Sequence, residues 1–161
     1  MSEQFFKKIV VAITGSESSM HAAMYAILFA KAHACKLKFV FVVDMATIKQ
    51  LTVAHFFSSD ESESYKKNLT SEGEKILAYV ERLSKSKSIP CETELRSGSV
   101  WAELVKVSDE WNADVIIAGG HLSASKQNAS VENNLRDLLA SAHCSVLVAK
   151  DKNVEERFKL A

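Results

Sequence analysis

Two short polar segments combine glycine with hydroxyl residues, the types that let backbone N–H groups surround an anion such as a phosphate. Thr14-Gly15-Ser16 closes the apolar run that begins at Lys8, and Gly119-Gly120-His121-Leu122 follows the apolar run 115–118. More donors stand just before a stretch of helical periodicity, where a helix N-terminus would attract an anion: Ser123, Ser125, Lys126, Asn128 and Ser130. The simpler interpretation is that these residues solvate a surface loop and cap a helix.

The signatures of several enzyme classes are absent from the sequence. No G-x-x-x-x-G-K-[ST] phosphate loop and no G-x-S-x-G nucleophile turn occurs, and Gly15-Ser16-Glu17 does not continue as G-x-G-x-x-G. The histidines are not spaced for zinc ligation with one another; they are His21, His33, His55, His121 and His143. We therefore expect neither catalysis nor a metal site.

The overall composition narrows the class of protein further. Lys and Arg together number 20, as do Asp and Glu, so there is no basic excess for binding nucleic-acid phosphates. No apolar run approaches the ~20 residues that span a bilayer. Three cysteines without a C-x-x-C pair favour a reducing compartment. We expect a cytoplasmic protein that binds neither nucleic acid nor membrane.

Short apolar runs alternate with longer stretches of helical periodicity, which is typical of a parallel sheet built from βαβ units. Strands are predicted at 8–14, 37–43, 91–96, 115–118 and 145–149, and helices within 20–28, 69–83, 100–111 and 131–142. We expect a Rossmann-like α/β fold, with an open five-stranded parallel sheet in the order 3-2-1-4-5 and helices on both faces.

Ligands of such sheets bind beyond the carboxyl ends of the strands, where the strand order reverses. In the expected order this crevice lies between the first and fourth strands, so the two glycine-containing segments would line it. Asp44, which follows the second strand, would approach it from one side.

Two regions depart from the alternating pattern. Residues 45–64 are expected to form a long connection, in which Phe56 and Phe57 would cover the crevice or a partner surface. Residues 151–161 are expected to form a charged C-terminal tail that is frayed or faces a partner. Residues 1–150 would form a single domain.

Five segments, in order along residues 5–150, resemble the universal stress protein family. They are K-K-I-V-V-A-I-T-G-S-E-S-S at 7–19, F-V-V-D at 41–44, R-S-G-S at 96–99, A-D-V-I-I-A-G at 113–119 and S-V-L-V at 145–148. No single segment is specific to the family, but the occurrence of all five in the same order along the chain is. The resemblance implies the 3-2-1-4-5 sheet and a homodimer that pairs through the strand Cys144 to Lys150. An apolar edge strand is a template for such pairing.

The resemblance also lays an ATP-binding motif on the chain, in which G-x-x-G is followed after nine residues by G-[ST]. Gly119 matches its first glycine, but Leu122 and Glu132-Asn133 replace the later positions, and Thr14 replaces the acidic residue that holds the nucleoside. A leucine in a left-handed turn would cost about 1–2 kcal/mol. Glu132 would repel a phosphate by up to roughly 4 kcal/mol at about 4 Å. The chain resembles the family branch with a degraded ATP motif.

From these observations we expect a dimeric, non-catalytic stress-response binding or adaptor module with little or no ATP affinity and with unidentified protein partners. The alternative is an ATP- or AMP-binding sensor, or a weak ATPase, that uses a rearranged phosphate loop. No cofactor is expected under the first interpretation. The residues of the candidate pocket are Thr14, Gly15, Val43, Gly119, Gly120, His121, Ser123, Lys126 and Asn133.

Overall fold

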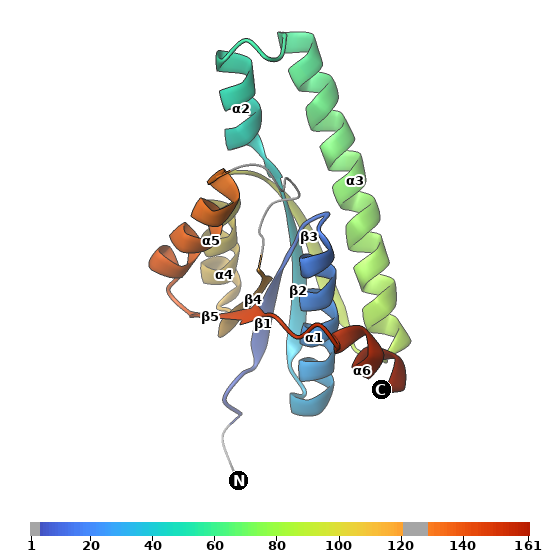
Figure 1. Ribbon diagram of the computed structural model, residues 1–161. Helices are drawn as coiled ribbons and strands as arrows, with labels where there is room; N and C mark the ends of the chain where they lie inside the picture. Colours follow the sequence, from blue (N-terminus) through green and yellow to red (C-terminus); the bar gives the residue numbers. More distant parts are fainter. Residues whose placement is uncertain (1–3, 121–128) are drawn as a thin grey trace.

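The computed structural model describes residues 4–120 and 129–161. Its centre is a parallel five-stranded sheet in the order β3-β2-β1-β4-β5 (Figure 1). The expected fold class and strand order are confirmed. The strands are β1 (Lys8–Ile13), β2 (Lys36–Asp44), β3 (Cys91–Gly98), β4 (Val115–Gly119) and β5 (Ser145–Ala149).

Helices cover both faces of the sheet because the central strands present apolar side chains alternately to each side. Ile9, Val11 and Ile13 face α1 (Glu17–His33), α3 (Ser59–Ser86) and α6 (Val154–Leu160). Val10 and Ala12 face α4 (Val100–Trp111) and α5 (Ala129–Ser141). Figure 1 shows these two helical layers on opposite sides of the strands.

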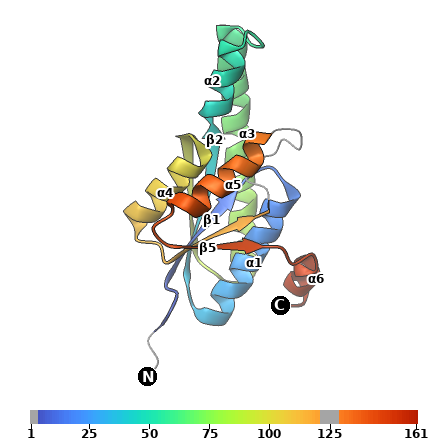
Figure 2. The ribbon, with the colours of Figure 1, turned by 60° about the vertical axis from the view of Figure 1, so that its left-hand side comes forward.

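The segment 45–64 is helical, so the expectation of a long connection is wrong. It contains α2 (Met45–Val53) and the first turns of α3, which together form a helical hairpin. Both views show this hairpin projecting past the carboxyl edge of the sheet (Figures 1 and 2). An exposed helix can be as polar as a loop, so the polar composition of this segment did not distinguish a helical hairpin from a long connection. The pattern Ser58-x-x-Glu61 was a readable signal, because the Ser58 hydroxyl accepts the Glu61 N–H as an N-cap.

The long helix α3 buries side chains fully only along its second half; in its first half, Leu69 packs partly buried against the core. Its buried residues are Gly73, Leu77, Val80 and Ser84. At Gly73 an added Cβ would lie 2.5 Å from Cδ1 of Phe41, so only glycine allows this close approach to β2. Phe56, at the tip of the hairpin, is exposed to solvent.

The C-terminal residues do not fray but return to the domain, which overturns that expectation. Helix α6 buries Val154 and Phe158, and Phe158 joins the core cluster of the α1 face. The Lys31 ammonium in α1 donates to the Ala161 carbonyl at 3.0 Å. The apolar pair Val154 and Phe158, four residues apart, was a helical signal within a mostly charged segment.

The two outer strands of the sheet differ in chemistry. On β3, the Arg96 guanidinium donates to Glu94 at 3.1 Å, to Glu103 at 2.7 Å and to Glu110 at 3.1 Å. On β5, three apolar side chains are only partly buried: Val146, Leu147 and Val148. Among the described residues, no helix has the length and apolarity required to cross a bilayer.

Candidate functional site

The carboxyl ends of β1 and β4 lie side by side, because these strands pair in parallel at the position where the strand order reverses. Thr14 follows β1, and Gly119 ends β4. Helix α1 begins directly after Thr14-Gly15-Ser16, so its N-terminal N–H groups point toward this edge of the sheet. The structure thus brings together Thr14, Gly15, Gly119 and Gly120 from the predicted set.

The turn between β1 and α1 is held by its own hydroxyl groups. The Thr14 hydroxyl accepts the Ser16 N–H at 3.1 Å and lies 2.7 Å from the Ser16 hydroxyl. Ser16 in turn caps α1 by accepting the Ser19 N–H at 3.3 Å. The buried Ser19 hydroxyl donates to the Thr14 carbonyl at 2.6 Å and accepts the Thr14 N–H at 3.0 Å. Thr14 therefore organises the turn, and no carboxylate stands at this position.

The two glycines after β4 have different surroundings. A Cβ added at Gly119 would lie 2.5 Å from the carbonyl oxygen of Ser18, so this glycine lets β4 approach the first turn of α1. A Cβ added at Gly120 would meet no atom within 4 Å among the described residues. Gly119 is therefore required for packing, whereas no described residue comes close to the position of a Cβ on Gly120.

Other predicted site residues are not placed to contact a ligand, or lie outside the described part of the chain. Val43 is 1% exposed and packs in the core of the α1 face, so its side chain cannot reach a ligand in the crevice. His121, Ser123 and Lys126 lie outside the described residues. Asn133 belongs to α5, where only its backbone is described.

Asp44 has a structural role that sequence reasoning missed. Its carboxylate accepts the Thr47 N–H at 3.1 Å and the Thr47 hydroxyl at 2.7 Å, which makes it the N-cap of α2. The spacing Asp44-x-x-Thr47, followed by Ile48, could have revealed the cap, but the segment was interpreted as a loop. These two bonds occupy the carboxylate that would approach the crevice.

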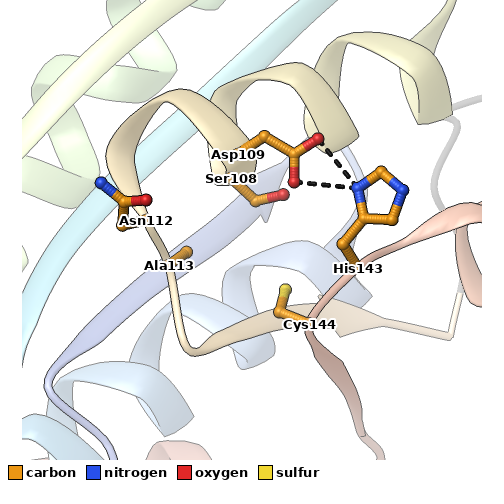
Figure 3. A pocket seen from close by; sticks show the side chains of 6 residues that line it. All are labelled: Ser108, Asp109, Asn112, Ala113, His143 and Cys144. Carbon is orange, nitrogen blue, oxygen red and sulfur yellow. Dashed lines mark hydrogen bonds and ion pairs between the residues drawn. The ribbon is translucent and has the colours of Figure 1, made fainter.

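A second group of polar residues lines a shallow hollow of about 240 Å³ at the opposite, amino edge of the sheet. Asp109 accepts from His143, whose Nδ1 lies 2.9 and 3.1 Å from the two carboxylate oxygens (Figure 3). Cys144 follows in the chain, and its side chain lies on the Ser108 side of the hollow, away from the ring (Figure 3). Burial raises the pKa of the Cys144 thiol, while a hydrogen bond with Ser108 lowers it less. The thiol stays protonated at neutral pH, so this group offers no activated nucleophile.

Comparison with known proteins agrees with the fold and with the sequence motifs. The family model described as the universal stress protein family matches residues 5–150. Universal stress protein MJ0531 of Methanocaldococcus jannaschii is 27% identical over 153 residues, which cover 95% of this chain and 87% of the relative. The structure of UspA from Lactobacillus plantarum superposes with a TM-score of 0.74 at 16% identity, covering 90% of this chain and 98% of that chain.

Two similar structures contain nucleotides. A universal stress protein from Archaeoglobus fulgidus, in complex with dAMP, superposes with a TM-score of 0.61 at 13% identity, covering 92% of this chain and 100% of that chain. A universal stress protein in complex with cAMP superposes with a TM-score of 0.60 at 18% identity, covering 89% of this chain and 96% of that chain. At these identities the likeness establishes the fold alone. Because the family match spans all five strands, the chain belongs to the universal stress protein family.

Proposed function

We propose that this protein is a dimeric, non-catalytic binding module of the universal stress protein family, from the branch that has lost most of its ATP affinity. The observation that carries the proposal is the hydrogen bonding of the Thr14 hydroxyl within its own turn. At the position where the family's acidic residue would hold a nucleoside, its hydroxyl is occupied by Ser16, 2.7 Å away. A neutral hydroxyl already bonded within its own turn is a weak acceptor for ribose hydroxyls.

The sequence of the phosphate segment supports the same proposal. Glu132 falls in the first turn of α5, the end of a helix that would otherwise attract a phosphate. From the sequence alone, a carboxylate at this position would interact favourably with the helix dipole and would repel the negative charges of a triphosphate. Leu122 stands where the family motif has its second glycine, outside the described residues.

The alternative function is that of a sensor for nucleoside monophosphates. The complexes with dAMP and cAMP favour it over an ATPase, since these ligands carry a single phosphate and need less of the triphosphate cradle. Among the described residues, none stands within 4 Å of a Cβ built on Gly120, which is compatible with such a group at this position. Under this alternative, the crevice would still bind a nucleotide, but the protein would neither bind nor hydrolyse ATP.

Calorimetric titration separates the two functions. We expect ATP, AMP, dAMP and cAMP each to bind more weakly than a Kd of about 100 μM, which corresponds to about −5.5 kcal/mol. Saturable binding of AMP, dAMP or cAMP below that value would favour the sensor, and saturable binding of ATP would overturn the loss of the ATP site. Thr14→Asp is the matched variant, because it restores the missing carboxylate and should strengthen any nucleoside binding that remains.

The dimer is proposed to form through β5 and its flanking residues, Cys144 to Lys150. An edge strand with unpaired backbone groups and partly exposed apolar side chains favours pairing with another copy. Native mass spectrometry at micromolar concentration should find two chains, and the same spectrum would reveal any small molecule that purifies with them. A single chain under these conditions would exclude the dimer.

The three cysteines support a cytoplasmic location. Cys35, Cys91 and Cys144 are all free thiols, and burial raises the pKa of each above its ordinary value. Free thiols of this kind persist in a reducing compartment.

A further inference from the structure

Three side chains that can bind a metal ion meet where α6 crosses α1. Glu17 and His21 stand one turn apart in α1, and Glu155 comes from the first turn of α6. The His21 Nε2 atom lies 3.1 Å from the Glu155 carboxylate and 3.9 Å from the Glu17 carboxylate. The three donor atoms all lie within 4.8 Å of one another. Segments 134 residues apart in sequence thus supply one cluster.

One proton cannot bridge the three groups of this cluster. The imidazole Nε2 carries at most one hydrogen, so it can donate to only one of the two carboxylates at a time. The second carboxylate is then left to water, and solvent weakens but does not remove the repulsion between the two negative charges. A divalent cation in place of that hydrogen would bind all three groups and neutralise both carboxylates.

We propose that Glu17, His21 and Glu155 bind a divalent transition-metal cation, with Zn²⁺ the best match to the donor set, and that the ion fastens α6 to α1. Zinc accepts imidazole nitrogen and carboxylate oxygen at roughly 2.0–2.2 Å, which places neighbouring ligand atoms about 3.3 Å apart in a tetrahedron. The observed separations of 3.1 and 3.9 Å bracket that value. Small rotations of the two glutamate side chains complete the site.

The burial of the three ligands suits an ion that arrives from solvent. The His21 side chain is 19% exposed, so packing fixes the ring, whereas Glu17 is 84% and Glu155 52% exposed. The open side leaves the fourth position for water. Spacing between histidines could not reveal this cluster, because it contains one histidine and is completed by a residue of the C-terminal helix.

Zinc binding would strengthen the attachment of α6, which otherwise depends on Val154 and Phe158 and on a few polar contacts. An ion that binds the folded arrangement and not the unfolded chain raises stability by mass action. With zinc at about a hundred times its Kd, we expect a rise in Tm of roughly 5–10 °C.

The test is a titration of the metal-free full chain with zinc chloride, followed by calorimetry and by thermal unfolding. We expect one Zn²⁺ per chain. His21→Asn and Glu155→Gln should each weaken binding by at least about tenfold and abolish the rise in Tm. The matched control is His143→Asn, since His143 faces the single carboxylate of Asp109 and should leave binding unchanged.

Either of two results would overturn the proposal. Binding that is absent below about 1 mM zinc would show that the cluster is an ion pair only. Binding that persists unchanged in both variants would place the ion elsewhere, for example on the thiols. Glu155 is exposed and His21 is partly buried, so circular dichroism of each variant without metal would establish that the fold is retained.

Discussion

The sheet has two outer strands, and these differ in the charge of the side chains along the exposed edge. On β3, C-E-T-E-L-R-S-G, charged residues alternate along the strand, and Arg96 is held by three glutamates. On β5, S-V-L-V-A, there is no ionisable side chain at all. Charged edges resist pairing with another chain, whereas uncharged apolar edges favour it. The contrast teaches that the β3 edge is protected against pairing by its charges, whereas β5 lacks this protection, as the proposed dimer requires.

The largest expected effect comes from giving β5 the chemistry of β3. Val148→Asp places a charge on the partly exposed face of β5, and a twofold axis would bring two copies of that charge together. Like charges across paired strands destabilise the pair. We expect the dimer dissociation constant to rise by at least about 100-fold, equivalent to about 2.8 kcal/mol, as measured by analytical ultracentrifugation.

The matched control for this substitution is Thr93→Asp, which adds the same charge to an exposed position of β3. The dimer constant should not change in that variant. If Val148→Asp leaves the protein dimeric while Thr93→Asp makes it monomeric, the assignment of the two edges is reversed.

A smaller effect is expected from removing the central charge of the protected edge. Arg96→Met would leave Glu103, whose side chain is 13% exposed, without its closest partner at 2.7 Å. A mostly buried carboxylate that loses a charged hydrogen bond destabilises the fold, here by about 2 kcal/mol. Urea unfolding would measure the loss. Arg157→Met, which removes an exposed ion pair with Asp151, should cost under about 0.5 kcal/mol.

Equal losses in these two arginine variants would mean that the glutamates around Arg96 add no more than an ordinary surface pair. The protected edge would then differ from β5 in charge alone and not in stability.

The smallest expected effect is on the stability of the fold at acidic pH. Burial by itself would raise the pKa of Glu103, but the hydrogen bond and charge of Arg96 outweigh burial, so the pKa lies below its ordinary value of 4.5. Such a carboxylate stabilises the fold above pH 4.5 and loses its contribution as the pH falls through the lowered pKa. As the pH falls below 4.5 and through the lowered pKa, the wild type should lose more stability than Glu103→Gln. Urea midpoints measured across this range check the difference.

Glu156→Gln, at an exposed position of α6, is the control for the acid experiment and should follow the wild type. An identical acid response in the wild type and Glu103→Gln would contradict the role given to the Arg96–Glu103 pair.

The sheet could be predicted from sequence because its central strands are buried on both faces and therefore read as continuous apolar runs. Val10, Val11 and Ile117 leave little room for another interpretation. The hairpin of α2 and α3 could not be predicted in the same way. Its helices lie largely in solvent, where polarity no longer separates a helix from a loop, and only the caps at Asp44 and Ser58 mark it.

The location of the candidate site was also predictable, since strand order fixes where the carboxyl ends of β1 and β4 meet. What each residue does there was not. The hydrogen bonds that occupy Thr14 and Asp44 depend on the local turn and on a helix that went unrecognised. The cluster around His21 needs the return of the C-terminal helix, a long-range contact that no local pattern encodes.

The one-sided attachment of α3 has a consequence for how the molecule moves. The helix has 28 residues, about 42 Å at 1.5 Å per residue. Its first fourteen residues bury no side chain fully, and of these only Leu69 packs against the core. Backbone amides there should exchange with deuterium through local opening, while those after Gly73 open only when the whole domain does. One unbroken helix would thus belong to two cooperative units, with the contact between Gly73 and Phe41 at their boundary.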